Sequence, residues 1–364
     1  MKKIKIYLQY PWEYSNCSYY EYLKKSPPKS VSYIDKNISN VKTDKKDVRK
    51  IFSFKNKVRT FLRKIKIGIP IIKNPGNAEA DLIFSAHSLI RCNKPWVMEL
   101  EYNNQFIFGP VNRLSKFISK KFLSSRNCKK ILTWSKWAKG EFLKEYPELK
   151  NKTEVLYPAI EIPKFKKISK KEIILLFVSR LFYFKGGLHA VEIMDRLTKK
   201  YENVKGFVVS DTPIEIMQRY STNKNIKFLG LVNKDKLMKD IFPNADIFLY
   251  PSYTDTFGFA ILEAMSFGLP VVSVEGQSRE ELIADGKTGF IIKEPKKWCV
   301  KNLENIKDLK DTIKEIERKT ELLIKDKKLR EKMGKAGRKE VAERRFSIKK
   351  RNEKLKKVYE EALK

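Results

Sequence analysis

Two cations stand beside a glycine pair at one point in the second half of the chain. Arg180 and Lys185 lie five residues apart, and Gly186-Gly187 follow directly. The apolar run before Arg180 predicts a buried strand, and the glycines would open the helix after it. A helix N-terminus that follows a strand end binds phosphate through backbone N–H groups, and neighbouring cations strengthen such a site. The segment predicts a diphosphate cradle; the alternative is that both cations are solvated loop residues.

A second segment places two carboxylates around a glycine turn. Asp255 follows a predicted strand, and Glu263 stands eight positions later in a predicted helix. Phe257, Gly258 and Phe259 lie between them, and the backbone of this helix start suits an anionic or oxygen-rich ligand. Glu263 would accept hydrogen bonds from a pair of sugar hydroxyls.

Both segments belong to a predicted parallel sheet. Uniformly apolar short runs separated by helical periodicity or turn signals are typical of strands that are covered on both faces. In the second half these runs are 173–178, 207–209, 226–229, 247–250, 271–274 and 290–292. In the first half they are 4–8, 81–85, 96–100, 130–134 and 154–157. The fold class is therefore predicted as α/β, with a Rossmann-like domain in each half.

The composition limits the remaining possibilities. A chain of 364 residues predicts two domains or one large one, and 42% hydrophobic residues suffice for real cores. The 78 Lys+Arg against 43 Asp+Glu give a net charge of +35, which attracts polyanions, anionic lipid surfaces or phosphorylated substrates. Lys, Ile and Asn are all abundant, as an AT-rich coding sequence would produce, and this background would explain the same excess of charge. Composition alone therefore does not choose among these interpretations.

The cysteines, histidines and apolar runs argue against other classes of protein. The four cysteines form no CxxC pair and there are only two histidines, which argues against a zinc site and a disulfide framework. No run reaches 18 apolar residues, and the first residues alternate as a strand does rather than as a signal peptide. The expected location is therefore cytoplasmic.

Two basic segments of the first half carry regularly spaced apolar residues. From Lys42 to Lys66 there are 11 Lys/Arg against 2 Asp, with apolar residues at spacings of three and four. A second such segment runs from Leu114 to Arg126. Each is predicted either to bury its apolar residues in the domain core or to lie on anionic lipid headgroups.

Five segments of the second half occur together in the order of a known family. They lie within residues 173–292 and are 178–187, 225–232, 244–252, 251–265 and 281–290. Together they resemble the retaining glycosyltransferases of family 4, which have the GT-B fold. The resemblance implies two Rossmann-like domains with parallel sheets facing a central cleft. We expect them at 1–162 on the acceptor side and 163–345 on the donor side, with a helix at 346–364 that packs back on the first.

The resemblance also implies roles for particular residues toward a nucleoside diphosphate sugar. Arg180 and Lys185 would contact the diphosphate, and Glu263, the second acid of the family's E-x7-E motif, would hold the ribose hydroxyls. Asp255 stands where the first glutamate normally lies and would meet the transferred sugar with a side chain that is one methylene shorter. Gly186, Phe257, Gly258 and Phe259 would line the phosphate and sugar, while Gly230 and Val232 would border the base.

The first domain departs further from the family pattern. Its loop at residues 10–16 lacks the Gly-Gly pair that commonly follows the first strand. Glu101 takes the position of a histidine found in many members, and we expect it in the cleft near the sugar or, alternatively, on the surface as an ordinary carboxylate. His87 is a second candidate for the cleft, and a structural histidine is its other interpretation.

The function implied is transfer of a sugar with retention of configuration to a hydroxyl of a glycan or lipid-linked acceptor, in cell-envelope glycan synthesis. No DxD metal motif is present, so no metal cofactor is expected. Peripheral contact with an anionic membrane at the inner face of the cell membrane is a further expectation. One alternative is a catalytically silent GT-B protein that binds nucleotide or glycan. Another is a basic nucleic-acid-binding protein, which no helix-turn-helix, zinc finger or RNP-like motif supports.

Overall fold

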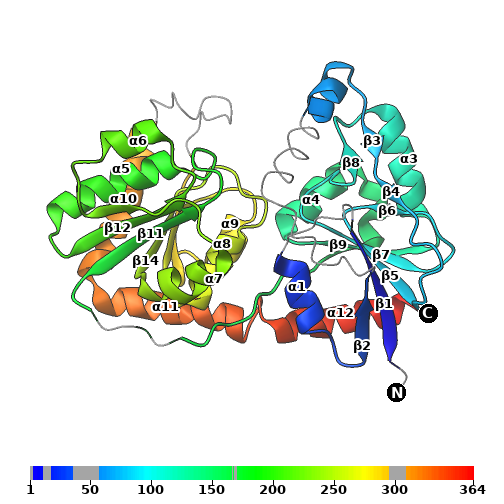
Figure 1. The fold of residues 1–364 in the computed structure, drawn as a ribbon. Helices are drawn as coiled ribbons and strands as arrows, with labels where there is room; N and C mark the ends of the chain where they lie inside the picture. The colour runs from blue at the N-terminus through cyan, green and yellow to red at the C-terminus, as the bar shows by residue number, and fades with distance from the viewer. Residues whose placement is uncertain (1–2, 11–17, 36–56, 166, 168–169, 295–308) are drawn as a thin grey trace. The chain divides into compact units, whose positions relative to one another are not determined.

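A computed structural model describes residues 3–10, 18–35, 57–165, 167, 170–294 and 309–364 (Figure 1). The chain divides into two compact units. The first comprises residues 1–159 together with 348–364, and the second comprises residues 160–347. Residues 42–56 of the predicted amphipathic segment, most of the 10–16 loop, Cys17 and Cys299 lie outside the described residues. No helix in the described ranges is long and apolar enough to cross a membrane.

The first unit is built on a six-stranded parallel sheet with strand order β10-β9-β7-β5-β1-β2. Its strands are β1 (Ile4–Gln9), β2 (Val31–Ile34), β5 (Leu82–Ala86), β7 (Trp96–Leu100), β9 (Cys128–Thr133) and β10 (Thr153–Val155). Both β5 and β7 are buried at every position, as expected for central strands that are covered on both faces. The predicted run at 96–100 coincides with β7, and four others overlap their strands.

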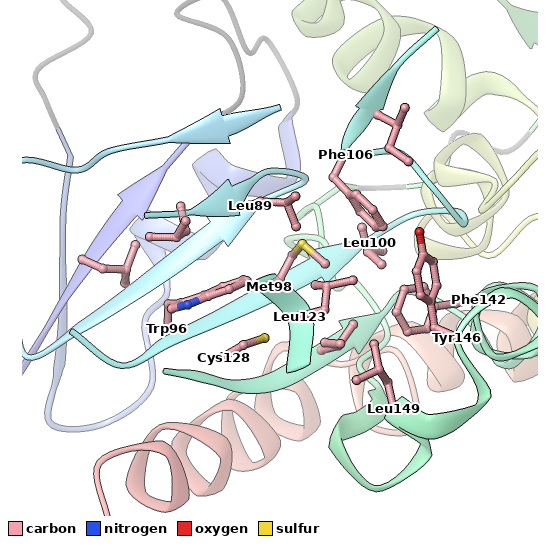
Figure 2. Packing of buried hydrophobic residues seen from close by; sticks show 14 of the residues in the cluster. Leu89, Trp96, Met98, Leu100, Phe106, Leu123, Cys128, Phe142, Tyr146 and Leu149 are labelled. Atoms are coloured by element: carbon pink, nitrogen blue, oxygen red, sulfur yellow. The ribbon is translucent and has the colours of Figure 1, made fainter. Parts of the chain in front are cut away.

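Helices and short strands complete the first unit. They are α1 (Ser18–Lys25), β3 (Ile69–Pro70), β4 (Ile72–Lys73), β6 (Leu89–Ile90), β8 (Ile107–Phe108), α3 (Arg113–Ser124), α4 (Lys136–Glu145), a 3-10 turn η1 (Pro147–Lys152) and α12 (Ile348–Ala362). Residues 57–64 are also helical. Aromatic and aliphatic side chains from β7, α3, β9 and α4 form one core cluster, including Trp96, Met98, Leu123 and Phe142 (Figure 2).

The last helix, α12, belongs to the first unit. Arg351 donates from Nη2 to the carbonyl oxygen of Ser26 at 2.7 Å. The hydroxyls of Tyr359 and Tyr33 form a hydrogen bond of 2.8 Å, which joins the helix to β2. The chain therefore returns to its first sheet after completing the second unit.

The second unit contains another six-stranded parallel sheet, with order β13-β12-β11-β14-β15-β16. Its strands are β11 (Ile173–Ser179), β12 (Val204–Ser210), β13 (Ile226–Phe228), β14 (Ile247–Tyr250), β15 (Val271–Val274) and β16 (Gly289–Ile292). Its helices are α5 (Gly187–Lys200), α6 (Ile214–Arg219), α7 (Lys234–Lys236), η2 (Leu237–Ile241), η3 (Phe242–Asn244), α8 (Phe259–Ser266), α9 (Arg279–Leu282), α10 (Lys310–Lys325) and α11 (Lys327–Ala342). Five of the six predicted apolar runs lie within these strands, and the sixth, 226–229, extends one residue past β13. The α/β prediction is confirmed.

Candidate functional site

The strand order of the second unit creates a switch point between β11 and β14. Strand β11 pairs with β12 on one side and with β14 on the other, so the connections leave in opposite directions. Ligands of open α/β sheets bind outside the carboxyl ends of the strands at such a point. The loop after β11 carries Arg180 and Lys185, and the loop after β14 carries Asp255.

A glycine lets these two loops touch. Gly186 has φ +73°, and a Cβ placed on it would lie 1.9 Å from the carbonyl oxygen of Pro251. Both the left-handed backbone and the absent side chain are therefore required here. This close approach of the two loops fixes the position of Lys185 relative to the loop after β14.

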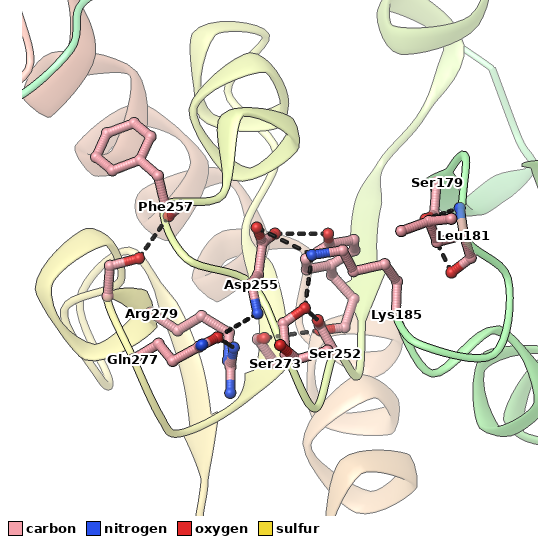
Figure 3. A network of polar contacts seen from close by, with 12 residues as sticks. Ser179, Leu181, Lys185, Ser252, Asp255, Phe257, Ser273, Gln277 and Arg279 are labelled. Carbon is pink, nitrogen blue, oxygen red and sulfur yellow. Dashed lines mark hydrogen bonds and ion pairs between the residues drawn. The ribbon is translucent and has the colours of Figure 1, made fainter. Parts of the chain in front are cut away.

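Lys185 and Asp255 form an ion pair across the switch point. Lys185 Nζ lies 3.0 Å from Asp255 Oδ1 and donates to the carbonyl oxygen of Thr254 at 2.5 Å. The Tyr250 hydroxyl donates to Asp255 Oδ2 at 2.7 Å. Figure 3 shows these contacts converging from the two loops. The shorter acid at position 255 is thus held by two partners at the carboxyl end of the sheet.

A third loop, after β15, also contacts Asp255. Gln277 Oε1 accepts a hydrogen bond from the backbone N–H of Asp255 (Figure 3). Arg279 is fully buried and donates to the carbonyl oxygens of Val274 and Glu275, each at 2.7 Å. Burial lowers the pKa of the Arg279 guanidinium, and the charge of Asp255 opposes that shift. The Arg279 guanidinium is therefore a buried cation that interacts with Asp255 and is held mainly by backbone carbonyls.

The second predicted acid lies near cations of its own. Glu263 is on α8, which begins after Gly258 at φ +98°. Its Oε1 lies 3.8 Å from Lys234 Nζ. Burial raises the pKa of the Glu263 carboxyl, while the charges of Lys234 and Arg180 lower it. The electrostatic link to Arg180 connects this acid with the first loop.

The turn before α8 is fixed by a side-chain hydrogen bond. The Ser278 hydroxyl donates to the carbonyl oxygen of Phe257 at 2.7 Å. Phe257 is fully buried, and Phe259 begins the helix. The predicted base-bordering pair follows β13, where Gly230 has φ +64° and open space around its Cα, and Val232 is half-buried. All ten predicted donor-site residues thus lie in loops or a helix start that follow strands of one sheet.

Glu101 belongs to the other unit. It directly follows β7, is half-buried, and its backbone N–H donates to Gln105 Oε1 at 2.9 Å. His87 follows β5 in a left-handed conformation, with Nδ1 3.0 Å from the carbonyl oxygen of Glu99 and Nε2 3.1 Å from the Tyr20 hydroxyl. Burial lowers the pKa of His87 to about 4, so the imidazole is neutral near pH 7. These contacts support the structural interpretation of His87.

Four residues of the site were not predicted from the sequence: Tyr250, Gln277, Arg279 and Lys234. The rule that loops after parallel strands carry the site would have nominated Gln277, because its loop follows the neighbouring strand β15. Nothing in the sequence distinguishes Arg279 from a solvated helix residue. Among the described residues, no group of three or more His, Cys, Asp and Glu is placed to hold a metal ion.

Comparison with known proteins decides the family. The sequence model of the family described as "Glycosyl transferases group 1" matches residues 159–340, half of the chain. The chain belongs to the group 1 glycosyltransferases. The matched residues include the loops after β11, β14 and β15 that form the site.

Curated relatives of this group 1 glycosyltransferase are distant in sequence. An uncharacterized glycosyltransferase of Haemophilus influenzae is 23% identical over 246 residues, which is 66% of each chain. The phosphatidylinositol N-acetylglucosaminyltransferase gpi3 subunit of Schizosaccharomyces pombe is 29% identical over 35% of this chain and 29% of its own. The sulfoquinovosyl transferase of Arabidopsis thaliana is 29% identical over 43% of this chain and 28% of its own. The chain thus spans about two-thirds of the first relative and under a third of the others.

Solved structures share the fold of this group 1 glycosyltransferase over its whole length. A glycosyltransferase of Rickettsia africae matches with a TM-score of 0.64 at 16% identity, covering 100% of this chain and 99% of its own. HepE of Anabaena, solved in complex with UDP, matches with a TM-score of 0.64 at 15% identity, covering 98% and 99%. The predicted GT-B fold, with two parallel six-stranded sheets, is confirmed.

Proposed function

We propose that the protein transfers a sugar from a nucleoside diphosphate sugar to an acceptor hydroxyl with retention of configuration. The observation that carries this proposal is the Lys185–Asp255 ion pair at the switch point, where the loop after β11 also carries Arg180. Lys185 Nζ, which we propose binds the diphosphate, lies 3.0 Å from Oδ1 of Asp255, which we propose binds the sugar. Cleavage of a glycosyl phosphate bond is favoured by a positive charge placed close to the departing diphosphate. In this proposal Lys185 supplies that charge, and Asp255 supplies a carboxylate that accepts hydrogen bonds from the sugar.

The proposed reaction breaks the bond between the sugar C1 and the β-phosphate oxygen. The acceptor oxygen forms its bond to C1 on the same face, and its proton passes to the departing phosphate oxygen. Lys185 and Arg180 offset the charge on that phosphate, without a metal ion. Asp255 accepts hydrogen bonds from the transferred sugar, and Glu263 accepts them from the ribose. A bound diphosphate would replace Asp255 as the partner of Lys185, leaving the carboxylate for the sugar.

The proposed acceptor is a glycan or a lipid-linked sugar in cell-envelope synthesis. Two names among the similar proteins support this class. The Schizosaccharomyces pombe relative acts as a subunit of a phosphatidylinositol N-acetylglucosaminyltransferase, and WaaG, whose structure matches with a TM-score of 0.59, is described as involved in lipopolysaccharide biosynthesis. A lipid-linked acceptor would place the enzyme on the cytoplasmic side of an anionic membrane.

The test is donor turnover detected by mass spectrometry. The full chain is incubated with UDP-, GDP- or ADP-sugars and a membrane-lipid extract as the source of acceptor. We expect one donor to be converted by the wild type and not by Glu263→Ala. The matched control is Glu202→Ala, which removes an exposed glutamate two residues before β12, at the amino end of the parallel strands and so away from the site.

Three outcomes would count against the proposal. Equal turnover by wild type and Glu263→Ala would show that this site does not perform the reaction. Nucleotide binding, seen as thermal stabilisation, with no conversion of any donor by any acceptor fraction would instead favour the catalytically silent alternative. An absence of both stabilisation and turnover would leave the donor site without support.

A further inference from the structure

Helix α3 of the first unit exposes two large apolar side chains to solvent. Leu114 and Phe117 on α3 are each 67% exposed. The same helix buries Ser115 and Ser119 against the unit. A helix folded only for its own domain would turn its large apolar residues inward and its serines outward. In α3 only the C-terminal end follows this rule, where Leu123 is buried in the core, whereas Leu114 and Phe117 face solvent.

A second segment adds apolar side chains to the same region. Phe61, Ile65, Ile67 and Ile69 are between 43% and 60% exposed, and Val111 precedes α3 at 42%. These five and the two on α3 are half of the fourteen large apolar residues that are most exposed in the described parts of the chain. Apolar residues gathered in this way mark an interaction site, whereas single exposed ones are ordinary.

The two segments form one continuous surface. Strand β3 pairs with β8 through Ile69 and Phe108, and α3 packs beside β3 (Figure 1). Asn112, the N-cap of α3, donates from Nδ2 to the carbonyl oxygen of Lys66 at 3.2 Å. A Cβ placed on Gly68 would lie 2.0 Å from the carbonyl oxygen of Pro110, so the segments are in close backbone contact. We call residues 57–69 with 111–121 the basic apolar face.

The charges on this face all have one sign. Residues 57–69 contain five Lys and Arg, residues 111–121 contain four, and neither contains Asp or Glu. Two of the nine, Lys116 and Lys120, pair with Glu145 and Glu148 at 2.8 and 2.9 Å. The other seven are exposed. Apolar side chains bordered by Lys and Arg match the boundary between acyl chains and anionic headgroups.

We propose that the basic apolar face docks the protein on an anionic lipid bilayer, with Leu114 and Phe117 entering the headgroup region. The proposal rests on the proposed function only for its biological purpose, which is access to a lipid-linked acceptor. A bilayer explains the exposed Leu114 and Phe117, since a polynucleotide offers no apolar phase for them. It also explains the uniform positive charge.

The test is flotation of the full chain with vesicles, without donor or acceptor. We expect binding to vesicles of phosphatidylglycerol with phosphatidylcholine and none to phosphatidylcholine alone. Leu114→Ser with Phe117→Ser should weaken binding at least tenfold, because burying either side chain is worth about one to two factors of ten. Arg63→Gln with Lys64→Gln should weaken it by about 30-fold, because each of the two charges is worth about 1 kcal/mol near an anionic surface.

Matched pairs outside the face control for hydrophobicity and net charge. Leu322→Ser with Leu363→Ser removes two exposed leucines, and Lys328→Gln with Lys335→Gln removes two exposed lysines of α11. We expect both pairs to bind as the wild type does. Thermal stabilisation by nucleotide, which should be unchanged in every variant, shows that the second unit is intact and tests the donor site separately.

Three results would overturn the proposal. The wild type could fail to bind anionic vesicles. The control pairs could weaken binding as much as the face pairs, which would make adsorption a property of the overall charge of +35. The apolar face pair could abolish self-association in sedimentation velocity while leaving vesicle binding unchanged, which would assign the face to a second copy of the chain.

Discussion

Replacing Gly186 by alanine tests whether the loops after β11 and β14 touch as described. The matched variant is Gly230→Ala, in the loop after β13. Both glycines have left-handed backbones, with φ +73° and +64°. A Cβ at Gly186 would lie 1.9 Å from the Pro251 carbonyl oxygen, whereas a Cβ at Gly230 would meet nothing within 4 Å. The pair therefore separates the cost of backbone conformation from the cost of close approach.

The two contributions differ in size. Holding alanine in the left-handed region costs about 1 kcal/mol relative to glycine, and both variants lose this amount. At Gly186 the Cβ would also overlap a backbone oxygen, so the two loops must separate. Overpacking of this kind costs a further ~1–3 kcal/mol. We expect Gly186→Ala to lower the free energy of unfolding by about 2–4 kcal/mol and Gly230→Ala to lower it by about 1 kcal/mol.

Two measurements distinguish the variants. Urea unfolding followed by circular dichroism gives the overall loss in stability. Hydrogen exchange with mass spectrometry, read on peptides that cover residues 180–187 and 250–258, locates it. We expect faster exchange in both peptides for Gly186→Ala and in neither for Gly230→Ala. Equal destabilisation by the two variants, with equal exchange at residues 250–258, would refute the loop contact and with it the placement of Lys185.

Three further predictions follow from other contacts. Lys185→Gln removes the cation beside Asp255 and should lower kcat/KM for the donor by about 10–100-fold in initial-rate assays, because a charge-assisted hydrogen bond is lost. Burial raises the pKa of Glu99 from its usual value of 4.5 to about 7, so its stabilising contribution is complete below pH 4.5, declines as pH rises and is lost above pH 7. Glu99→Gln should remove a decline of up to about 3 kcal/mol across that window in urea unfolding at several pH values. Tyr359→Phe leaves the Tyr33 hydroxyl without this partner and should lower stability by about 1–2 kcal/mol in the same assay.

Each of these predictions has a control. Lys328→Gln removes an exposed lysine and should leave turnover unchanged; equal losses would deny Lys185 its role. Glu21→Gln, at an exposed site of α1, should keep the pH slope of the wild type, and a Glu99→Gln variant with that same slope would contradict the assigned pKa. The Tyr33→Phe/Tyr359→Phe double variant should lose no more stability than either single variant, and additive losses would show that the hydroxyls are not coupled.

The main strands could be predicted from the sequence alone because buried strands consist mostly of apolar residues. Strands β7, β14 and β15 coincide with predicted apolar runs, since a strand that is covered on both faces is apolar at every position. The two-residue strands β3, β4, β6 and β8 were not predicted, because pairing across the chain rather than local pattern creates them. Strand β2 is mostly half-buried and was also missed.

The sequence also selected Arg180, Lys185, Asp255 and Glu263 by spacing and residue type, which are local properties of the chain. Tertiary structure decided that Lys185 meets Asp255, seventy residues away, because the sheet places β14 beside β11. It decided likewise that Arg279 is buried beneath them. The net charge of +35 was readable from composition, but the inward turn of the α3 serines was not. Which face of a helix is buried depends on what packs against it, and only the folded chain specifies that.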